Sequence, residues 1–268
     1  MSRSIPRQNL RDPSFQVTGY AKPSTRRKIL AWIVNSILRF LTGLLCRMDA
    51  GELERIPPHG PLILVGNHIN FLEVPALISR VWPRPVTGFS KLETWHNPFK
   101  AFLFNVWGGI PLRRGEADLE AFRKAEQALA DGVIFAIAPE GTRSRNGRLQ
   151  KGHPGTALLA VRSGAPLMPM AFFGNEFFWR NIKKLKRTDF HVRVGNPFWI
   201  DTQGKGLSRE VREQVIREVM YQLAALMPPQ NRGVYADLEN ATEEFLRFQP
   251  GVKSNLERAT LPGSTNDL

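Results

Sequence analysis

Apolar residues recur along this chain with two periods, and the order of those periods predicts its fold class. Continuous apolar runs, typical of buried strands, occur at three places: 61–66, 133–138 and 166–173. Helical spacing predicts helices at four places: near 75–81, over 118–130, over 156–162, and from Ser208 to the stop at Pro228 and Pro229. Residues 190–194 alternate like a half-exposed strand. We expect a single α/β domain with a mixed, largely parallel sheet flanked by helices.

The longest apolar run lies near the N-terminus, at residues 29–46, and Asn35, Ser36 and Arg39 interrupt its middle. An arginine at the centre of a membrane span costs about 2.5 to 3.5 kcal/mol on insertion scales. We therefore predict that the domain is preceded by an interfacial helix at 29–48, amphipathic and membrane-associating, rather than by a true span. A helix packed on the domain is the second alternative.

Composition divides the chain into four segments. A basic flexible tail at 1–28 precedes the helix at 29–48, and a folded domain at 49–248 precedes a disordered tail at 249–268. Cys46 is the only cysteine, which excludes an internal disulfide and favours a reducing, cytosol-facing location. We expect no cleavable signal peptide at the start of the chain.

The formal net charge of +13 is unevenly distributed. The first 47 residues hold nine basic side chains and a single acidic one, Asp12. A second basic cluster follows five aromatic residues of 172–179, and its members are Arg180, Lys183, Lys184, Lys186 and Arg187. Such patches suit anionic lipid headgroups, nucleic acid or an acidic carrier protein. For the second cluster we predict a lipid contact, with an ordinary core-plus-loop segment as the alternative.

The end of the first apolar run carries the pattern that points to chemistry. His68 follows the run, and Glu73 lies five residues further on. Five residues of one helix turn through about 500°, so these side chains should meet across a strand-to-helix turn. A neutral imidazole is suited to remove a proton from an alcohol near pH 7, and a carboxylate can orient it. We predict His68 as a general base and Glu73 as its orienter, while a structural histidine is the plainer alternative.

Further motifs follow in a fixed order. Gly108 is followed six residues later by Arg114, and the block Pro139–Ser144 reads Pro-Glu-Gly-Thr-Arg-Ser. Lys151-Gly152 comes next, and Pro169 interrupts a short apolar strand. Together with Asn67-His68 these motifs resemble the glycerolipid acyltransferase family, typified by the bacterial 1-acyl-sn-glycerol-3-phosphate acyltransferases (PlsC-like). The resemblance covers roughly residues 60–200, within the domain of 49–248, which it identifies as an acyltransferase domain.

The sequence departs from the family pattern at two positions. Ala138 stands where the family usually has phenylalanine, and Glu73 stands where it usually has aspartate. Glutamate reaches one methylene further and loses more rotamer freedom when it is fixed. It can still orient His68, although from a displaced backbone that would reshape the acceptor pocket.

The resemblance implies transfer of an acyl chain from a thioester, acyl-CoA or acyl-carrier protein, to the free hydroxyl of 1-acyl-sn-glycerol-3-phosphate, giving phosphatidic acid. By the same resemblance, Arg114, Arg143 and Lys151 would bind the acceptor phosphate, a ligand that suits guanidinium and ammonium groups. Glu140, Gly141 and Thr142 would shape the acceptor site. We expect no metal and no cofactor other than the acyl donor, because the histidines are scattered and no metal-binding motif is present.

Two alternatives remain open. One is an acyltransferase of the same fold that acts on another lysolipid or on an amino-containing lipid. The other, ranked lower, is a basic membrane- or nucleic-acid-binding protein without catalysis; the chain shows no nucleic-acid reader motif. The expected partners are a lysophospholipid acceptor, an acyl thioester donor, with acyl-carrier protein as one form, and an anionic membrane surface. The expected location is the cytoplasmic face of the cell membrane, peripheral or monotopic.

Overall fold

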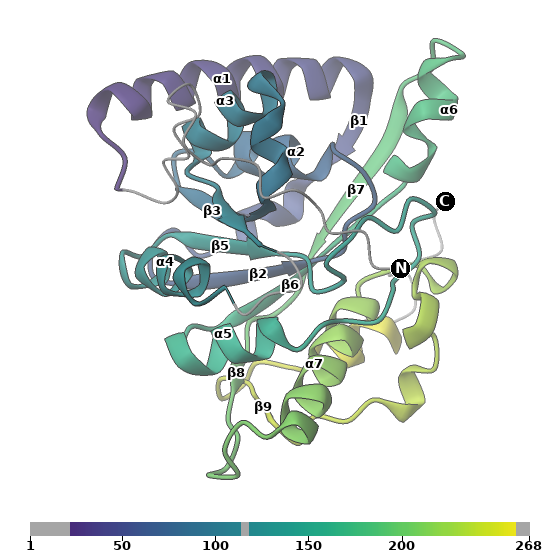
Figure 1. Ribbon diagram of the computed structural model, residues 1–268. Helices are drawn as coiled ribbons and strands as arrows, with labels where there is room; N and C mark the ends of the chain where they lie inside the picture. The colour runs from purple at the N-terminus through teal and green to yellow at the C-terminus, as the bar shows by residue number, and fades with distance from the viewer. Residues whose placement is uncertain (1–21, 114–117, 261–268) are drawn as a thin grey trace, which may run out of the picture.

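The computed structural model describes residues 22–113 and 118–260, and its centre is a seven-stranded sheet in the order β1-β7-β6-β2-β5-β3-β4 (Figure 1). The strands are β1 (Cys46–Asp49), β2 (Leu62–Gly66), β3 (Val86–Lys91), β4 (Ile110–Leu112), β5 (Ile134–Ile137), β6 (Leu167–Phe173) and β7 (Thr188–Val194). All neighbouring pairs are parallel except β6 and β7. The predicted mixed, largely parallel sheet is confirmed.

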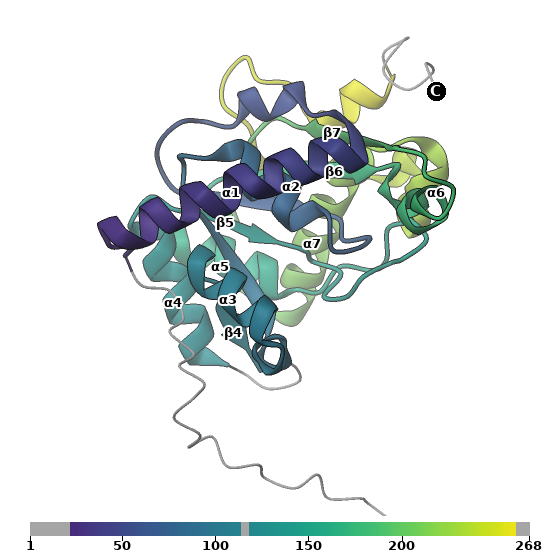
Figure 2. The same ribbon diagram turned by 90° about the horizontal axis from the view of Figure 1, so that it is seen from above.

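Helices cover both faces of this sheet. They are α1 (Thr25–Leu45), α2 (Glu73–Val81), α3 (Pro98–Trp107), α4 (Leu119–Ala130), α5 (Gly155–Ser163), α6 (Phe178–Ile182) and α7 (Arg209–Ala224). Figure 1 shows α1, α2 and α3 above the sheet and α4, α5 and α7 on the opposite side, and Figure 2 shows α1 lying lengthwise over α2. Two hydrophobic cores, one on each face, join the helices to the sheet. A two-stranded sheet, β8 (Trp199–Ile200) with β9 (Leu246–Arg247), lies beside α5.

The central strands explain the continuous apolar runs and also position the loops that follow them. Every residue of β2 and β6 is buried, because helices cover both faces of these strands. The two strands run parallel, and Gly66 at the end of β2 pairs with Met170 of β6. Their following loops therefore emerge at the same edge of the sheet, which is where open α/β sheets place ligands.

Helix α1 buries two polar side chains, Asn35 and Thr42, and exposes most of its large apolar ones. Asn35 accepts a hydrogen bond from the Trp107 indole at 3.1 Å, and Thr42 accepts one from the Arg80 guanidinium at 2.9 Å. Eight large apolar side chains of α1 are exposed: Ile29, Leu30, Trp32, Ile33, Ile37, Phe40, Leu41 and Leu44. Within the described ranges, α1 is the one helix long and apolar enough, by length and composition, to cross a membrane.

Several predicted boundaries were wrong at the two ends of the chain. The N-terminal helix begins at Thr25, inside the predicted tail of 1–28, and it ends at Leu45 because 46–49 pair with β7 as a strand. Residues 1–21 of the predicted tail lie outside the described part. The predicted disordered tail of 249–268 is wrong for 249–260, where the fully buried Asn255 hydrogen-bonds to Gln222 of α7. Helix α7 ends at Ala224, before Pro228.

Candidate active site

His68 and Glu73 meet across the turn that joins β2 to α2. Glu73 is the first residue of α2, and its Oε2 lies 2.8 Å from Nδ1 of His68. The Glu73 side chain is 4% exposed and the His68 side chain is 24% exposed. The carboxylate is therefore buried behind an imidazole that still reaches solvent, which is the geometry that the five-residue spacing predicted.

The other oxygen of Glu73 is saturated by donors. Oε1 accepts hydrogen bonds from the backbone N–H of Asn70 at 2.9 Å and of Ile69 at 3.3 Å, and from the Nδ2 amide of Asn175. A carboxylate that accepts this many bonds has little rotational freedom. The glutamate is thus fixed in place with Oε2 directed at the imidazole, and the extra methylene relative to aspartate does not displace it.

Arg143 contacts the other nitrogen of the imidazole. Its Nε donates to Nε2 of His68 at 3.3 Å, from the loop that follows β5. Only the tautomer with hydrogen on Nδ1 satisfies both this contact and the Glu73 bond. In that tautomer the Nε2 lone pair, which a general base would use, accepts from Arg143. The exposed guanidinium of Arg143 lies where an acceptor would approach.

Glu140 holds the loop after β5 against the backbone of His68. Its Oε1 accepts from the His68 backbone N–H at 2.9 Å, and its Oε2 accepts from that of Gln150 at 3.0 Å. The Ser144 backbone N–H donates to the His68 carbonyl at 2.7 Å. Burial raises the pKa of the Glu140 carboxyl, against the lowering effect of the two backbone donors. Glu140 is nearly inaccessible to solvent, so its contacts are those of a positioning residue.

Two further motif residues have structural explanations. The side-chain amide of Asn67 is buried and makes two hydrogen bonds to the backbone of Phe172 in β6, at 2.7 and 2.8 Å. Gly141 has φ +65°, and a Cβ there would lie 3.1 Å from Cδ2 of His153. Because other residues rarely adopt this conformation, a glycine fits the turn that carries Thr142 and Arg143 past the imidazole.

The remaining predicted phosphate ligands are Arg114 and Lys151. Arg114 lies outside the described residues. Lys151 is exposed, and in the described part of the chain no hydrogen bond or ion pair joins it to His68 or Arg143. Its charge acts on α7 instead, where the pKa of Glu213 is lowered first by Arg209 and more weakly by Lys151. Thr142 is exposed beside Arg143.

Sequence reasoning missed Asn175 and Asn70. Asn175 is fully buried just beyond β6 and donates to Glu73, while the Asn70 side chain donates to the Asn175 carbonyl at 2.7 Å. The only signal was a polar residue directly after a long apolar run. Among the described residues, no group of three His, Cys, Asp or Glu side chains is placed to hold a metal ion.

An α/β sheet with a carboxylate-oriented histidine at its carboxyl edge defines a domain equipped for acid–base chemistry on an entering hydroxyl. Comparison with known proteins is consistent with this class. Residues 47–173 match the family model described as Acyltransferase. This span includes His68, Glu73, Glu140 and Arg143.

The relatives carry one name. The 1-acyl-sn-glycerol-3-phosphate acyltransferase of Borreliella burgdorferi is 29% identical over 175 residues, which cover 62% of this chain and 69% of that protein. The chloroplastic enzyme of the same name from Brassica napus is 27% identical over 131 residues, or 48% of this chain, and the match spans only 38% of its own length. The Thermotoga maritima enzyme PlsC shares the fold, with a TM-score of 0.52 and 22% identity over 72% of this chain and 78% of that one.

Proposed function

We propose that this protein transfers an acyl chain from a thioester donor to the free hydroxyl of 1-acyl-sn-glycerol-3-phosphate, giving phosphatidic acid. The observation that carries the proposal is the 2.8 Å contact between Nδ1 of His68 and Glu73, which directs Nε2 away from the carboxylate and toward exposed Arg143. The names of the relatives support the acceptor. The family domain supports the reaction class.

The proposed reaction needs only groups that the site presents. Nε2 of His68 takes the proton of the acceptor hydroxyl as its oxygen attacks the thioester carbonyl carbon. Glu73 stabilises the imidazolium that forms, without taking the proton itself. The carbon–sulfur bond then breaks, and the thiolate leaves with the proton from the imidazolium. The products are an ester and a thiol, and His68 returns to its neutral form.

Arg143 is the proposed ligand of the acceptor phosphate. Its guanidinium is exposed and already touches Nε2, so a lysophospholipid that binds its phosphate there brings its hydroxyl near the base. Arg114 and Lys151 are proposed as additional cations on the strength of their motifs. Glu140 is proposed to position the loop rather than to touch substrate, because both of its oxygens are engaged.

We further propose that the protein lies on the cytoplasmic membrane surface through α1. Helix α1 exposes eight large apolar side chains and buries Asn35 and Thr42. Transfer of its outer face from water to lipid is therefore favourable. Because α1 packs along its length on α2, β1 and α3, an interfacial position keeps these contacts intact. This placement would bring the site to a lipid acceptor.

The test is acyl transfer from an oleoyl thioester to 1-acyl-glycerol-3-phosphate in mixed micelles, followed by release of thiol and by lipid product. His68→Ala should lower the rate by about 10² to 10⁴, the usual contribution of a general base. His59→Ala is the matched control, because His59 is exposed and lies outside the site. Equal rates for wild type and His68→Ala would overturn the mechanism.

The acceptor is tested by varying it at a constant donor concentration. Arg143→Ala should raise the KM for the lysophosphatidic acceptor far more than the KM for the donor, because it removes a charge-assisted contact to phosphate. Product formed only with a phosphate-free or amino-containing acceptor would retain the chemistry and reject the proposed substrate.

A further inference from the structure

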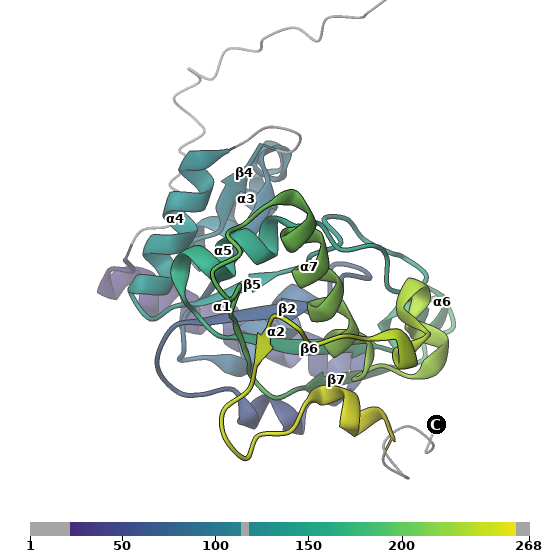
Figure 3. The ribbon, with the colours of Figure 1, turned by 90° about the horizontal axis from the view of Figure 1, so that it is seen from below.

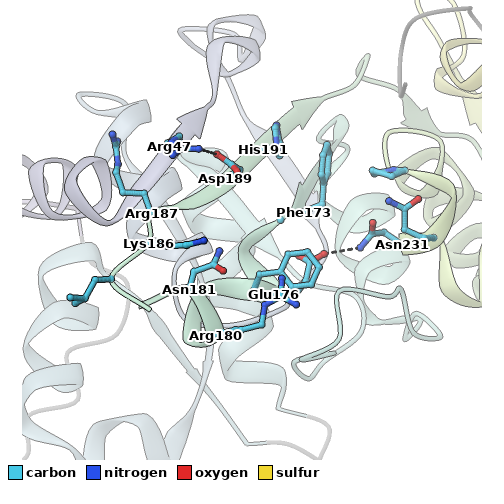
Figure 4. A pocket seen from close by; sticks show the side chains of 15 residues that line it. Arg47, Phe173, Glu176, Arg180, Asn181, Lys186, Arg187, Asp189, His191 and Asn231 are labelled. Carbon is cyan, nitrogen blue, oxygen red and sulfur yellow. Dashed lines mark hydrogen bonds and ion pairs between the residues drawn. The ribbon is translucent and has the colours of Figure 1, made fainter. Parts of the chain in front are cut away.

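A cavity of about 810 Å³ opens at the same edge of the sheet as His68, and the proposed function does not use it (Figure 4). Its volume is within the range of pockets that hold small-molecule ligands. Figure 4 shows the side chains of Arg180 and Lys186 on the α6 side of the cavity and Asn231 on the opposite side. The Arg47–Asp189 ion pair lies on a third side, where β1 and β7 begin.

The lining of this cavity carries excess positive charge. Its basic members are Arg47, Arg180, Lys186 and Arg187, and its acidic members are Glu176 and Asp189. Asp189 is already paired with Arg47 at 3.3 Å, and Glu176 accepts from the Asn231 amide at 3.3 Å. Among the described residues, no carboxylate lies within ion-pair distance of Arg180 or Lys186. Unneutralised cations around a concave space favour a multivalent anion.

Flat apolar surfaces lie beside these cations. The guanidinium of Arg180 sits 4.5 Å from the centroid of the Phe177 ring, and that ring is partly exposed. The Phe173 ring stacks on His191, with centroids 4.9 Å apart and planes 13° apart. A guanidinium stacked on an aromatic ring extends the flat surface on which a nucleobase can stack. The cavity therefore combines contacts for phosphate with contacts for a heteroaromatic base.

The cavity is joined to the histidine site through one residue. Gly174 and Glu176 line the cavity, and Asn175 between them donates to Glu73. A ligand that is held in the cavity by its charged end and carries an extended, flexible arm can direct that arm toward the imidazole. An acyl-CoA has this construction, with a phosphorylated nucleotide at one end, a pantetheine arm, and a thioester at the other end.

We propose that this cavity binds the nucleotide end of an acyl-CoA donor, with Arg180, Lys186 and Arg187 on its phosphates and Phe177 beside its base. The proposal rests on the proposed function, and it selects acyl-CoA over acyl-carrier protein. A carrier protein would contact the outer surface of the protein. Lys183 and Lys184, between α6 and β7, are exposed there and do not line the cavity. The concave position of Arg180 and Lys186 fits a small molecule better.

The experiment compares three donors with one acyl chain: oleoyl-CoA, oleoyl-dephospho-CoA and oleoyl-pantetheine. The variants are Arg180→Ala/Lys186→Ala and the matched control Lys183→Ala/Lys184→Ala, which removes the same charge outside the cavity. The cavity variant should raise the KM for oleoyl-CoA by about tenfold or more, since one hydrogen bond to a charged group accounts for about a factor of ten. Its KM for oleoyl-pantetheine and for the acceptor should stay unchanged, as should every constant of the control variant.

Several outcomes would overturn the proposal. Equal increases in the KM for oleoyl-CoA and for oleoyl-pantetheine would show that Arg180 and Lys186 do not bind the nucleotide. A raised KM for the acceptor would assign the cavity to the acceptor phosphate. In a parallel vesicle-sedimentation assay, equal losses of binding to anionic vesicles in both variants would assign the cluster to the membrane. With oleoyl-carrier protein as a fourth donor, a loss confined to that donor would assign the cluster to a protein donor.

Binding of free CoA separates this proposal from the proposed function. Calorimetric titration of the His68→Ala protein with CoA needs no catalysis, and the cavity variant should lose that binding while Lys183→Ala/Lys184→Ala keeps it. If CoA binds in this way but no acyl transfer is found, the cavity assignment stands and the proposed reaction falls. If acyl transfer occurs without measurable CoA binding in the cavity, the proposed reaction stands and the cavity assignment falls.

Discussion

Helices α1 and α7 lie on opposite faces of one sheet (Figure 3) and differ in the side chains that they expose. Val215, Val219 and Leu223 of α7 are fully buried, while Arg209 and Arg217 are exposed. In α1 the side chains turned to the domain include Asn35 and Thr42, whereas large apolar side chains face outward. The first arrangement is that of a helix in water, whereas the second leaves an exposed apolar face of the kind that marks an interaction site.

The difference teaches how to interpret polar residues within an apolar run. Asn35 interrupts the run at 29–46, and on sequence grounds it weakens the case for a lipid-facing helix. In the structure it binds Trp107 on the protein side, so it leaves the outer face apolar. Arg39 and Ser36 remain exposed and keep that face from being uniformly apolar. Polar residues in such a run mark the protein-facing side of the helix as readily as the water-facing side.

The largest expected effect comes from placing a charge on each helix. Val219→Asp buries a carboxylate in the core under α7 and should lower the free energy of unfolding by more than about 4 kcal/mol. Ile37→Asp on the outer face of α1 should change it by less than about 0.5 kcal/mol. Urea unfolding followed by circular dichroism measures both. A similar loss in the two variants would mean that the outer face of α1 is buried in the protein alone.

A smaller effect is expected from replacing the polar residue that each helix buries. Glu218 of α7 accepts from the backbone N–H of Glu244 and Phe245, both at 3.0 Å, so Glu218→Leu leaves two backbone donors without their acceptor, one of them, that of Phe245, buried. We expect a loss of about 3 kcal/mol for this variant. Asn35→Leu removes one bond and should cost about 1 kcal/mol. The same unfolding assay applies, and a larger cost for Asn35→Leu would contradict this ranking.

Membrane binding should depend on one helix only. Trp32→Ser removes an exposed indole from α1, and the lost burial in lipid of about 2 kcal/mol should lower partitioning into anionic vesicles about thirtyfold. Val234→Ser is the control, because Val234 is a comparably exposed apolar residue outside α1. Sedimentation with vesicles gives both partition coefficients. An equal decrease of the partition coefficient in Trp32→Ser and Val234→Ser would show that membrane binding does not depend on α1 in particular.

The smallest expected effect distinguishes a helix that lies on the membrane from one that crosses it. Cys46 is buried at the end of α1, and its burial raises the pKa of the thiol, so little of the reactive thiolate is present. Alkylation by iodoacetamide should be slow in the folded protein and unchanged when vesicles are added. Faster alkylation on vesicles would show that α1 leaves the domain to span the bilayer. Urea-unfolded protein, which reacts fully, is the control.

The sequence predicted the elements whose pattern is local and missed those whose pairing is distant. The runs at 61–66 and 166–173 became β2 and β6 because both faces of these strands are covered. Strand β1 was missed because the prediction extended the preceding helix to residue 48, whereas Cys46–Asp49 are fixed as a strand by pairing with β7. Strands β3 and β4 and helix α3 were not predicted. In α3, buried Trp107 and exposed Phe99 leave no clear polar face.

The candidate site shows the same division. The meeting of His68 and Glu73 could be predicted from a spacing of five residues, because it depends only on the local turn. The contact from Glu140 spans 72 positions, and that from Asn175 spans 102. These contacts exist because β2, β5 and β6 lie side by side, which the order of the motifs does not reveal. The motifs therefore indicate most of the residues that belong to the candidate site, and the structure explains how these residues hold and orient the imidazole.

The contact between Arg143 and Nε2 of His68 has a consequence for the fate of the activated acyl group. In the structure the Arg143 guanidinium already donates to the Nε2 lone pair of His68, which is the lone pair that would deprotonate water. Water has no anionic group to draw the guanidinium away, whereas a phosphate-bearing alcohol does. On the proposed mechanism the base is released by the same substrate that consumes the acyl group, so the enzyme would discriminate against wasteful hydrolysis of its donor without having to seal the site.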